Sequence, residues 1–142
     1  MLFDIQKVLG TLAALALSFS SFSLPAYAQN AYPSGPITMI VGWPAGGPSD
    51  NVARLIATKI SIAIGQPVVI DNRAGAGGNI GSDIASRARP DGYTIMLATV
   101  ASHGLNSALY PKLNYDPIKD FAPVGFITSS PSTLLVPVDS PI

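Results

Sequence analysis

Cysteine is absent from this chain of 142 residues. Its absence excludes a disulfide framework, thiolate metal sites and a lipid-modified cysteine behind a leader peptide. Glutamate is absent as well, and the 8 acidic residues are balanced by 8 lysines and arginines, for a net charge of zero. A chain without excess positive charge lacks the electrostatic footprint of a nucleic-acid binder. We therefore expect small molecules or proteins as partners, and no nucleic acid.

Histidine occurs once, as His103, so a metal site or acid–base chemistry would rest on that residue alone. Zinc sites take three or four protein ligands, and neither a second histidine nor a cysteine is present to complete one. We predict no metal and no cofactor.

Three nucleotide and enzyme motifs are each incomplete. Residues 75–81 read Gly-x-Gly-x-x-x-Gly, one residue longer than the dinucleotide fingerprint. Neither glycine-rich loop ends in the Gly-Lys-Ser/Thr of a phosphate loop. Ser49 is placed as in a nucleophile elbow, but Asn51 stands where the elbow requires glycine. The patterns therefore favour neither a nucleotide-binding protein nor a serine hydrolase.

Residues 1–28 have the pattern of a secretory signal peptide. Lys7 precedes an apolar run at 8–17, and Ala26-Tyr27-Ala28 supplies the small-x-small pattern that signal peptidase reads. The alternative is an uncleaved membrane anchor, but a span needs about 20 apolar residues. We expect cleavage after Ala28 and a soluble, exported mature chain from Gln29.

Apolar runs at 37–41, 67–70 and 93–98 predict three strands, the last preceded by an Asp-Gly turn signal. Helical patterns separate them, which implies right-handed crossovers and a parallel sheet. The predicted class is a doubly wound α/β fold. Residues 121–128 and 133–138 are two further strand candidates, with no helix following the second.

The first helix is expected to begin with Ser49 or Asp50 as its N-cap and to end at Gly65. Its predicted buried face is the set Val52, Ile56, Ile60 and Ala63, which recur every three or four residues. The second helix is expected near residues 79–88.

Two glycine-rich loops, 42–50 and 72–81, each connect a predicted strand to a predicted helix. Glycines let backbone N–H groups approach a ligand closely, and a helix N-terminus adds unpaired donors and a positive dipole end. Ligands of doubly wound sheets bind outside the carboxyl ends of the strands, where residues 99–103 are also expected. We predict that these three segments share one anionic ligand.

A longer series of motifs resembles one known family. The matching segments are Tyr32-Pro33, Pro36-Ile37, Gly46-Gly47-Pro48-Ser49-Asp50, Ala53-Arg54, Gly65-Gln66-Pro67-Val68-Val69, Asn72-Arg73-x-Gly75-Ala76-Gly77-Gly78-Asn79-Ile80-Gly81, Pro90-Asp91-Gly92-Tyr93-Thr94, Leu109-Tyr110, Tyr115-Asp116-Pro117 and Asp120-Phe121-Ala122-Pro123-Val124. Together they resemble the Bug family, the extracytoplasmic solute-binding proteins of tripartite tricarboxylate transporters. Ser107 and Asn114 depart from the family, which commonly has proline there, and this affects only local turns.

The resemblance implies a periplasmic protein with a fold of the periplasmic-binding-protein type II kind. Such a protein encloses a carboxylate solute between two lobes, acts as a monomer and delivers the solute to a membrane permease. Family members are about twice as long or more, so residues 29–142 resemble an N-terminal portion. This portion would be mainly the first lobe, with the crossover to the second lobe from about residue 125.

The candidate ligand-binding residues combine the family loops with the strand-end positions. They are Trp43, Gly46, Gly47, Ser49, Asp50, Ala76, Gly77, Gly78, Asn79, Thr99, Ser102 and His103. By resemblance, backbone amides and ordered waters from the two loops hold the carboxylate.

Each candidate also has a purely structural interpretation. Ser49 and Asp50 suit helix capping, Trp43 suits the core or the rim of the cleft, and the glycines suit tight turns. Arg73 could bind a carboxylate or pair with a neighbouring aspartate. Two other functions stay open: a secreted hydrolase or transferase that uses Ser49 or Ser102 with His103, and a remnant that binds nothing.

Overall fold

The computed structural model describes residues 32–130 and 133–141. The predicted signal peptide and its cleavage site lie outside these residues, so both stay predictions. Within the described residues, none of the helices is long and apolar enough to cross a bilayer.

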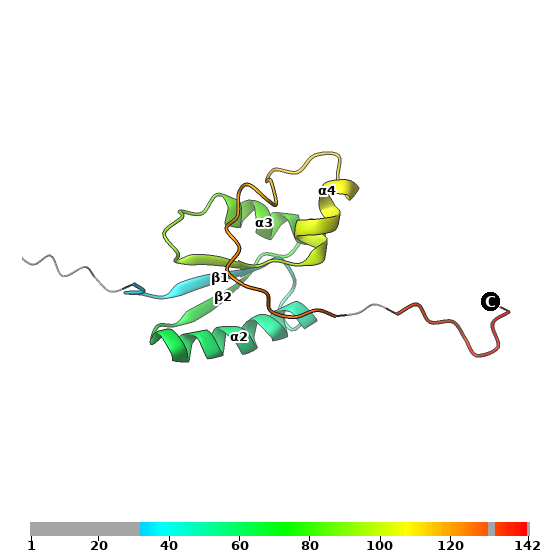
Figure 1. The fold of residues 1–142 in the computed structure, drawn as a ribbon, viewed down its shortest axis with the longest axis horizontal. Helices are drawn as coiled ribbons and strands as arrows, with labels where there is room; N and C mark the ends of the chain where they lie inside the picture. Colours follow the sequence, from blue (N-terminus) through cyan, green and yellow to red (C-terminus); the bar gives the residue numbers. More distant parts are fainter. Residues whose placement is uncertain (1–31, 131–132, 142) are drawn as a thin grey trace, which may run out of the picture. The chain divides into compact units, whose positions relative to one another are not determined.

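The sheet has three parallel strands in the order β2-β1-β3 (Figure 1). They are β1 (Ile37–Val41), β2 (Val68–Asn72) and β3 (Thr94–Leu97). The strands lie where the sequence predicts them, although β2 begins one residue later and runs two residues further. The extension follows from the ladder with β1, whose last pair is Val41 with Asn72.

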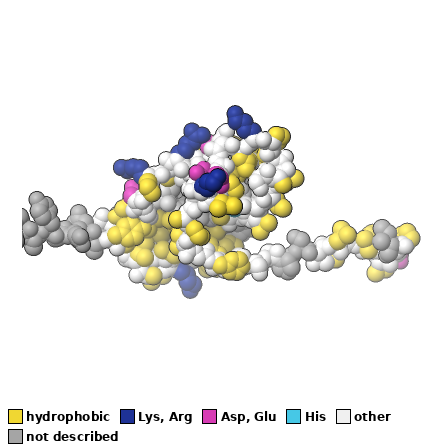
Figure 2. All heavy atoms as spheres, turned by 45° about the horizontal axis from the view of Figure 1, so that its top comes forward, with side chains coloured by type: hydrophobic (Ala, Val, Ile, Leu, Met, Phe, Trp, Pro, Cys, Tyr) yellow, Lys and Arg dark blue, Asp and Glu magenta, His cyan; other side chains and the backbone are white. Residues whose placement is uncertain are grey.

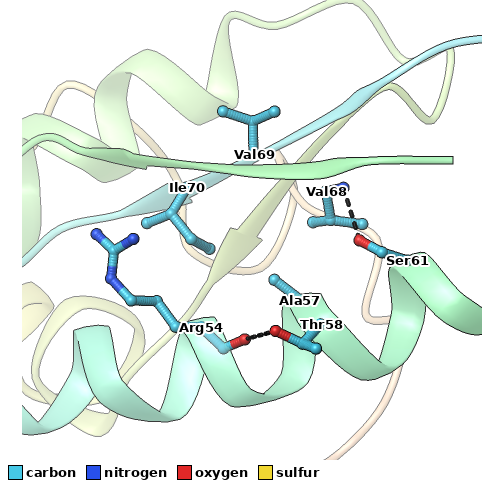
Figure 3. Close-up of a pocket in the computed structure, with 7 residues that line it drawn as sticks. All are labelled: Arg54, Ala57, Thr58, Ser61, Val68, Val69 and Ile70. Atoms are coloured by element: carbon cyan, nitrogen blue, oxygen red, sulfur yellow. Dashed lines mark hydrogen bonds between the residues drawn. The ribbon is translucent and has the colours of Figure 1, made fainter.

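The central strand β1 is buried on both faces, as expected of an apolar run in a parallel sheet. Strand β2 alternates instead. Figure 3 shows Val68 and Ile70 on the side of helix α2, whereas Val69 points to the opposite face and is 53% exposed.

Helix α2 (Pro48–Ile64) begins earlier than predicted. Its N-cap is Gly47 and its first residue is Pro48, so the prediction of Ser49 or Asp50 as the N-cap is wrong. Proline suits a first helical position because its missing N–H would have no partner there. The predicted end is confirmed: Gly65 has φ 68° and its N–H donates to the carbonyl of Ser61.

The buried face of α2 is rotated from the predicted one. Ala53 and Ala57 are buried against the sheet, with Ile56 and Ile60 packed beside them, while Ala63 is exposed. Small alanines at the centre let the helix approach the sheet closely. The core lies between this face and residues Met39, Val41 and Leu97 of the strands.

Helix α3 (Asn79–Ser86) contacts β1 and β3 and lies on the face of the sheet opposite α2 (Figure 1). Helices on both faces of a parallel sheet confirm the doubly wound α/β class. A 3₁₀ turn, η1 (Ala76–Gly78), precedes α3.

Two short elements after β3 were not predicted. A π-helical turn, η2 (Ala101–Leu105), continues into α4 (Asn106–Leu109). Both carry few apolar residues in a helical repeat, so periodicity does not reveal them.

The strands predicted at 121–128 and 133–138 are wrong, because neither segment is a strand in the structure. A strand needs a hydrogen-bonded neighbour, and within the described residues neither segment lies in a ladder. Most of their side chains are exposed, and Val124 and Leu134 are each 94% exposed.

We predict that Gly65→Ala lowers the free energy of unfolding by about 1 kcal/mol, because its left-handed φ costs a residue with a Cβ about that much. No atom lies within 4 Å of the added Cβ, so only the backbone term acts. Urea unfolding measures the effect, and Gly35→Ala is the control, since that site is equally open and has no positive φ. Equal stabilities of the two variants would contradict the left-handed cap.

Candidate functional site

The candidate site lies at the carboxyl ends of β1 and β3. The chain passes from β1 to β2 through α2 on one face of the sheet, and from β2 to β3 through α3 on the other face. The direction of the connections therefore reverses between the neighbouring strands β1 and β3. The crevice at such a switch point is where doubly wound sheets bind ligands. The loops after β1 and β2 and the segment after β3 meet there, as the sequence predicts.

The two glycine loops touch backbone to backbone. A Cβ placed on Gly42 would lie 3.0 Å from Cα of Gly78, and one on Gly81 would lie 2.9 Å from Cα of Gly42. A Cβ on Gly78 would lie 3.3 Å from Cβ of Ser102 and 3.9 Å from Nε1 of Trp43. Glycine at these positions therefore permits the close approach of all three segments.

Asp50 holds the first loop in place. Its side chain is 1% exposed, and Oδ2 accepts hydrogen bonds from Nε of Arg54 and from the N–H of Gly46, both at 2.8 Å. Its Oδ1 accepts a hydrogen bond from Nδ2 of Asn72 at 2.9 Å, and the same amide also donates to the carbonyl of Trp43. One buried carboxylate thus joins the first loop, α2 and the end of β2.

These hydrogen bonds keep Asp50 ionised. The bond from Arg54 contributes most, and the bonds from Gly46 and Asn72 add to it, so the pKa of Asp50 falls from 3.8 to about 2. The same contact raises the pKa of Arg54. Since the Asp50 carboxylate already has three donors, we assign its side chain to the support of the loop.

The free donors of the first loop differ from those expected. The N–H of Gly46 is bonded to Asp50, and the N–H of Gly47 donates to the carbonyl of Pro44 at 3.3 Å. The N–H groups of Ser49 and Asp50 lie in the first turn of α2, where a helix has no internal acceptors. Asp50 is 1% exposed, so Ser49 is the more accessible of the two.

The second loop has an unusual backbone. Gly75, Gly77 and Gly78 have φ of 137°, 65° and 93°, and Ala76 between them has φ 48°. Four successive residues in a region that disfavours side chains explain the glycine spacing. They turn the chain sharply from β2 into η1 and α3.

Side chains from α4 and the following loop hold the second loop. Nδ2 of Asn106 donates to the carbonyl of Gly77 at 3.0 Å and to Oδ1 of Asn79 at 2.6 Å. The hydroxyl of Tyr115 lies within hydrogen-bonding distance of Oδ1 of Asn79, at 2.9 Å, and of the carbonyl of Ser102, at 2.5 Å. Asn106 and Tyr115 are 3% and 6% exposed.

Ser102 and His103 do not form an accessible nucleophile and base. Oγ of Ser102 lies 2.9 Å from Nδ1 of His103, but Ser102 is 1% exposed. Oγ also lies among the polar atoms of Thr99, at 3.2 Å from both its N–H and its hydroxyl. Nε2 of His103 is buried and has no hydrogen-bond partner within the described part of the chain, and burial lowers the pKa of this histidine.

The ring of His103 packs edge-on against Phe121, with 4.6 Å between ring centroids, and lies 6.0 Å from the ring of Tyr115. Thr99, Ser102 and His103 thus lie beneath the site as support. Arg73 pairs with Asp71 through Nε and Oδ1 at 2.9 Å, which is the structural alternative that the sequence left open.

Three supporting residues escaped the sequence prediction: Asn72, Asn106 and Tyr115. Their partners are 13 to 36 residues away in the chain. Asn106 and Tyr115 do stand within or beside segments that resemble the family, but the resemblance names no role for them.

A separate groove lies between α2 and the outer edge of β2 (Figure 3). Its lining includes Arg54, Thr58 and Ser61 of the helix and Val68 and Ile70 of the strand. Ser61 Oγ accepts a hydrogen bond from the N–H of Val68, so one polar group is used to dock the helix on the strand. None of the predicted ligand-binding residues lines it.

We predict that Asp50 makes stability depend on acid pH. Because folding lowers its pKa from 3.8 to about 2, its contribution is complete above the unfolded value and is lost as the pH falls through that window. The free energy of unfolding, measured with urea along a pH series, should therefore fall more steeply in the wild type than in Asp50→Asn. Parallel pH curves for the two proteins would show that folding does not lower the pKa of Asp50.

We also predict that Gly81→Ala destabilises the chain by about 1–3 kcal/mol, the usual cost of overpacking. The added Cβ would lie 2.9 Å from Cα of Gly42 and 3.1 Å from the carbonyl oxygen of Arg73, and both are backbone atoms. Gly104→Ala is the matched control, since it also lies in a helical segment and its nearest neighbour would be 3.8 Å away. Urea unfolding should leave the control unchanged or more stable, and the reverse order would disprove the loop contact.

The chain matches the model of the tripartite tricarboxylate transporter family receptor over residues 52–142. It is 46% identical over 131 residues to a protein from the tcbD-tcbE intergenic region of Pseudomonas sp. strain P51. That match covers 91% of this chain and 38% of the relative, so the chain spans well under half of the relative's length.

Two solved structures resemble it as well. MatC from Rhodopseudomonas palustris, solved with bound malate, is 42% identical with a TM-score of 0.66 over 68% of this chain and 33% of its own. The periplasmic binding protein BugD is 42% identical with a TM-score of 0.64 over 66% of this chain and 31% of its own. These matches confirm the predicted periplasmic-binding-protein fold and the resemblance to the Bug family. The chain belongs to the family of tripartite tricarboxylate transporter receptors.

Proposed function

We propose that this chain carries the carboxylate-binding loops of a periplasmic solute receptor, which binds a small carboxylate and delivers it to a membrane permease. The observation that carries the proposal is the contact of two glycine loops at the switch point, beside the first turns of α2 and α3. Two helix N-termini that meet at one crevice suit an anion, because they add a positive dipole end and first-turn N–H groups without intrahelical acceptors.

The donors that face the ligand are uncharged in this proposal. Arg54 is bonded to Asp50 and Arg73 is bonded to Asp71. The face shown in Figure 2 likewise has its lysine and arginine side chains apart from one another, with acidic side chains beside several of them. The backbone N–H groups of Ser49 and Gly77, with the side chain of Asn79, are the donors we propose.

The ligand class follows from this donor set and from the relatives. N–H groups at two facing loops suit a carboxylate, and MatC was solved with malate. We therefore propose a small dicarboxylate such as malate for this chain. The permease is proposed on the family description, and the periplasmic location on the periplasmic relatives and the predicted signal peptide. A monomeric state is proposed on the family resemblance alone.

An enzymatic function is not supported. The family description names a receptor, and the serine of the best-placed serine–histidine pair, Ser102, is buried. A hydrolase also needs an oriented base, but among the described residues Nε2 of His103 has no partner.

We predict that the chain binds malate with a dissociation constant in the millimolar range, about −4 kcal/mol. Loops on a single lobe leave a ligand half in water, where each neutral hydrogen bond contributes about 1 kcal/mol. Titration of the ¹⁵N-labelled chain with malate should shift the amide resonances of Ser49 and Gly77 saturably. Micromolar binding by a monomer would show that one lobe is a complete site, and shifts spread evenly over the surface would contradict the site.

We further predict that Gly78→Val removes most malate binding, since its side chain would meet Ser102 and its φ of 93° disfavours a Cβ. Arg73→Ala should bind within about twofold of the wild type, because Arg73 pairs with Asp71 and surface pairs contribute only about 0–1 kcal/mol. The same titration measures both variants. The opposite ranking would indicate a salt bridge to the ligand.

A further inference from the structure

The carboxamide of Asn79 is held by two buried residues. Its Oδ1 faces Nδ2 of Asn106 at 2.6 Å and the hydroxyl of Tyr115 at 2.9 Å. Asn106 begins α4 and Tyr115 lies in the loop beyond it, so both come from a part of the chain distant from Asn79. Two donors on one oxygen fix the plane and the direction of this amide.

The other end of the amide is left for a ligand. A flip of Asn79 would place its NH₂ group against the NH₂ of Asn106, which is itself bonded to the carbonyl of Gly77. Two donors facing each other are unfavourable, so the network selects one orientation. In that orientation Nδ2 of Asn79 has no protein partner among the described residues, and it offers two N–H donors beside the second glycine loop.

Tyr115 ties this arrangement to the third segment of the site. Its single hydroxyl proton faces both Oδ1 of Asn79 and the carbonyl of Ser102. The ring stands 6.0 Å from those of His103 and Phe121, which limits its movement. Loss of the Tyr115 hydroxyl would therefore change the orientation of the Asn79 side chain, even though Tyr115 does not contact a ligand.

We propose that Asn106 and Tyr115 are positioning residues that hold Asn79 with its NH₂ group directed to a carboxylate of the ligand. The inference rests on the proposed function and adds to it the source of the side-chain donor. Preorganisation matters here because an amide fixed before binding loses no rotamer freedom when the ligand arrives.

The test is a double-mutant cycle on malate binding. A hydrogen bond to a charged group corresponds to about a tenfold or larger change in affinity, so Asn79→Ala should weaken malate binding at least that much. Tyr115→Phe removes only the hydroxyl and should weaken it about threefold to tenfold, as a partly released donor would. In the double variant Tyr115→Phe should add nothing, because it acts through Asn79.

Two variants control for loss of stability. Tyr93→Phe removes a tyrosine hydroxyl that accepts a hydrogen bond from the N–H of Ser34, before the start of β1 and away from the ligand edge. It should leave malate affinity unchanged. Asn106→Asp puts a carboxylate against two carbonyl oxygens and should weaken binding, whereas Asn114→Asp at an exposed position should not.

A measurement without ligand tests the positioning of Asn79 by Asn106 and Tyr115 separately from the proposed function. The heteronuclear NOE of the Asn79 side-chain amide should match that of the backbone in the wild type and in Tyr93→Phe, and it should fall in Tyr115→Phe. An unchanged NOE in Tyr115→Phe, or additive effects in the cycle, would overturn the positioning role. A wild type that binds no dicarboxylate would instead overturn the proposed function. The NOE would still decide whether Asn106 and Tyr115 hold the side chain of Asn79.

Discussion

The contact between the backbones of the two glycine loops is the constraint on which the site depends. Gly42, Gly78 and Gly81 approach so closely that an added methyl group at Gly42 or Gly81 would meet backbone atoms at about van der Waals overlap, 2.9–3.0 Å. Backbone atoms cannot rotate away as a side chain can, so the spacing of the loops is set by the absence of Cβ atoms. The distance between the first turns of α2 and α3 is therefore set by this contact.

Two clusters of polar side chains hold the two glycine loops in their conformations. Asp50, in the first turn of α2, fixes the first loop, and Asn106 and Tyr115 fix the second. The first cluster is built on a buried charge whose three donors offset its loss of water. In this cluster the N–H of Gly46 donates to Asp50, so it is not available to a ligand.

The sequence predicted those parts of the structure that local pattern controls. The three strands, the end of α2 at Gly65 and the meeting of three segments follow from apolar runs, glycine and parallel topology. The start of α2 was misplaced because Pro48 and Gly47 compete with Ser49 and Asp50 for the helix terminus. The role of Asp50 was missed for a related reason, since its carboxylate reaches back to Gly46 and across to Asn72 rather than capping its own helix.

Long-range polar contacts were beyond sequence reasoning. Nothing in the residues around Asn106 or Tyr115 indicates that both meet the side chain of Asn79, because the contact depends on how η2 and α4 fold back over the edge. For residues 121–128 and 133–138 the sequence predicted strands that the structure does not contain. Their β propensity is real, but a ladder depends on a neighbouring strand, and propensity does not supply one.

The outer edge of β2 has a consequence for the behaviour of this chain in solution. Its ladder groups on that side lie beside the groove with α2, and Val69 is 53% exposed on the adjoining face. The apolar residues Leu134, Leu135 and Val138 are 82–101% exposed in a segment without helix or strand. Within the described residues β2 has no ladder partner on its outer side, and an unpaired strand edge is a site for intermolecular strand addition. Exposed surfaces of this kind favour self-association at high protein concentration, and this tendency is separate from the chemistry of the ligand loops.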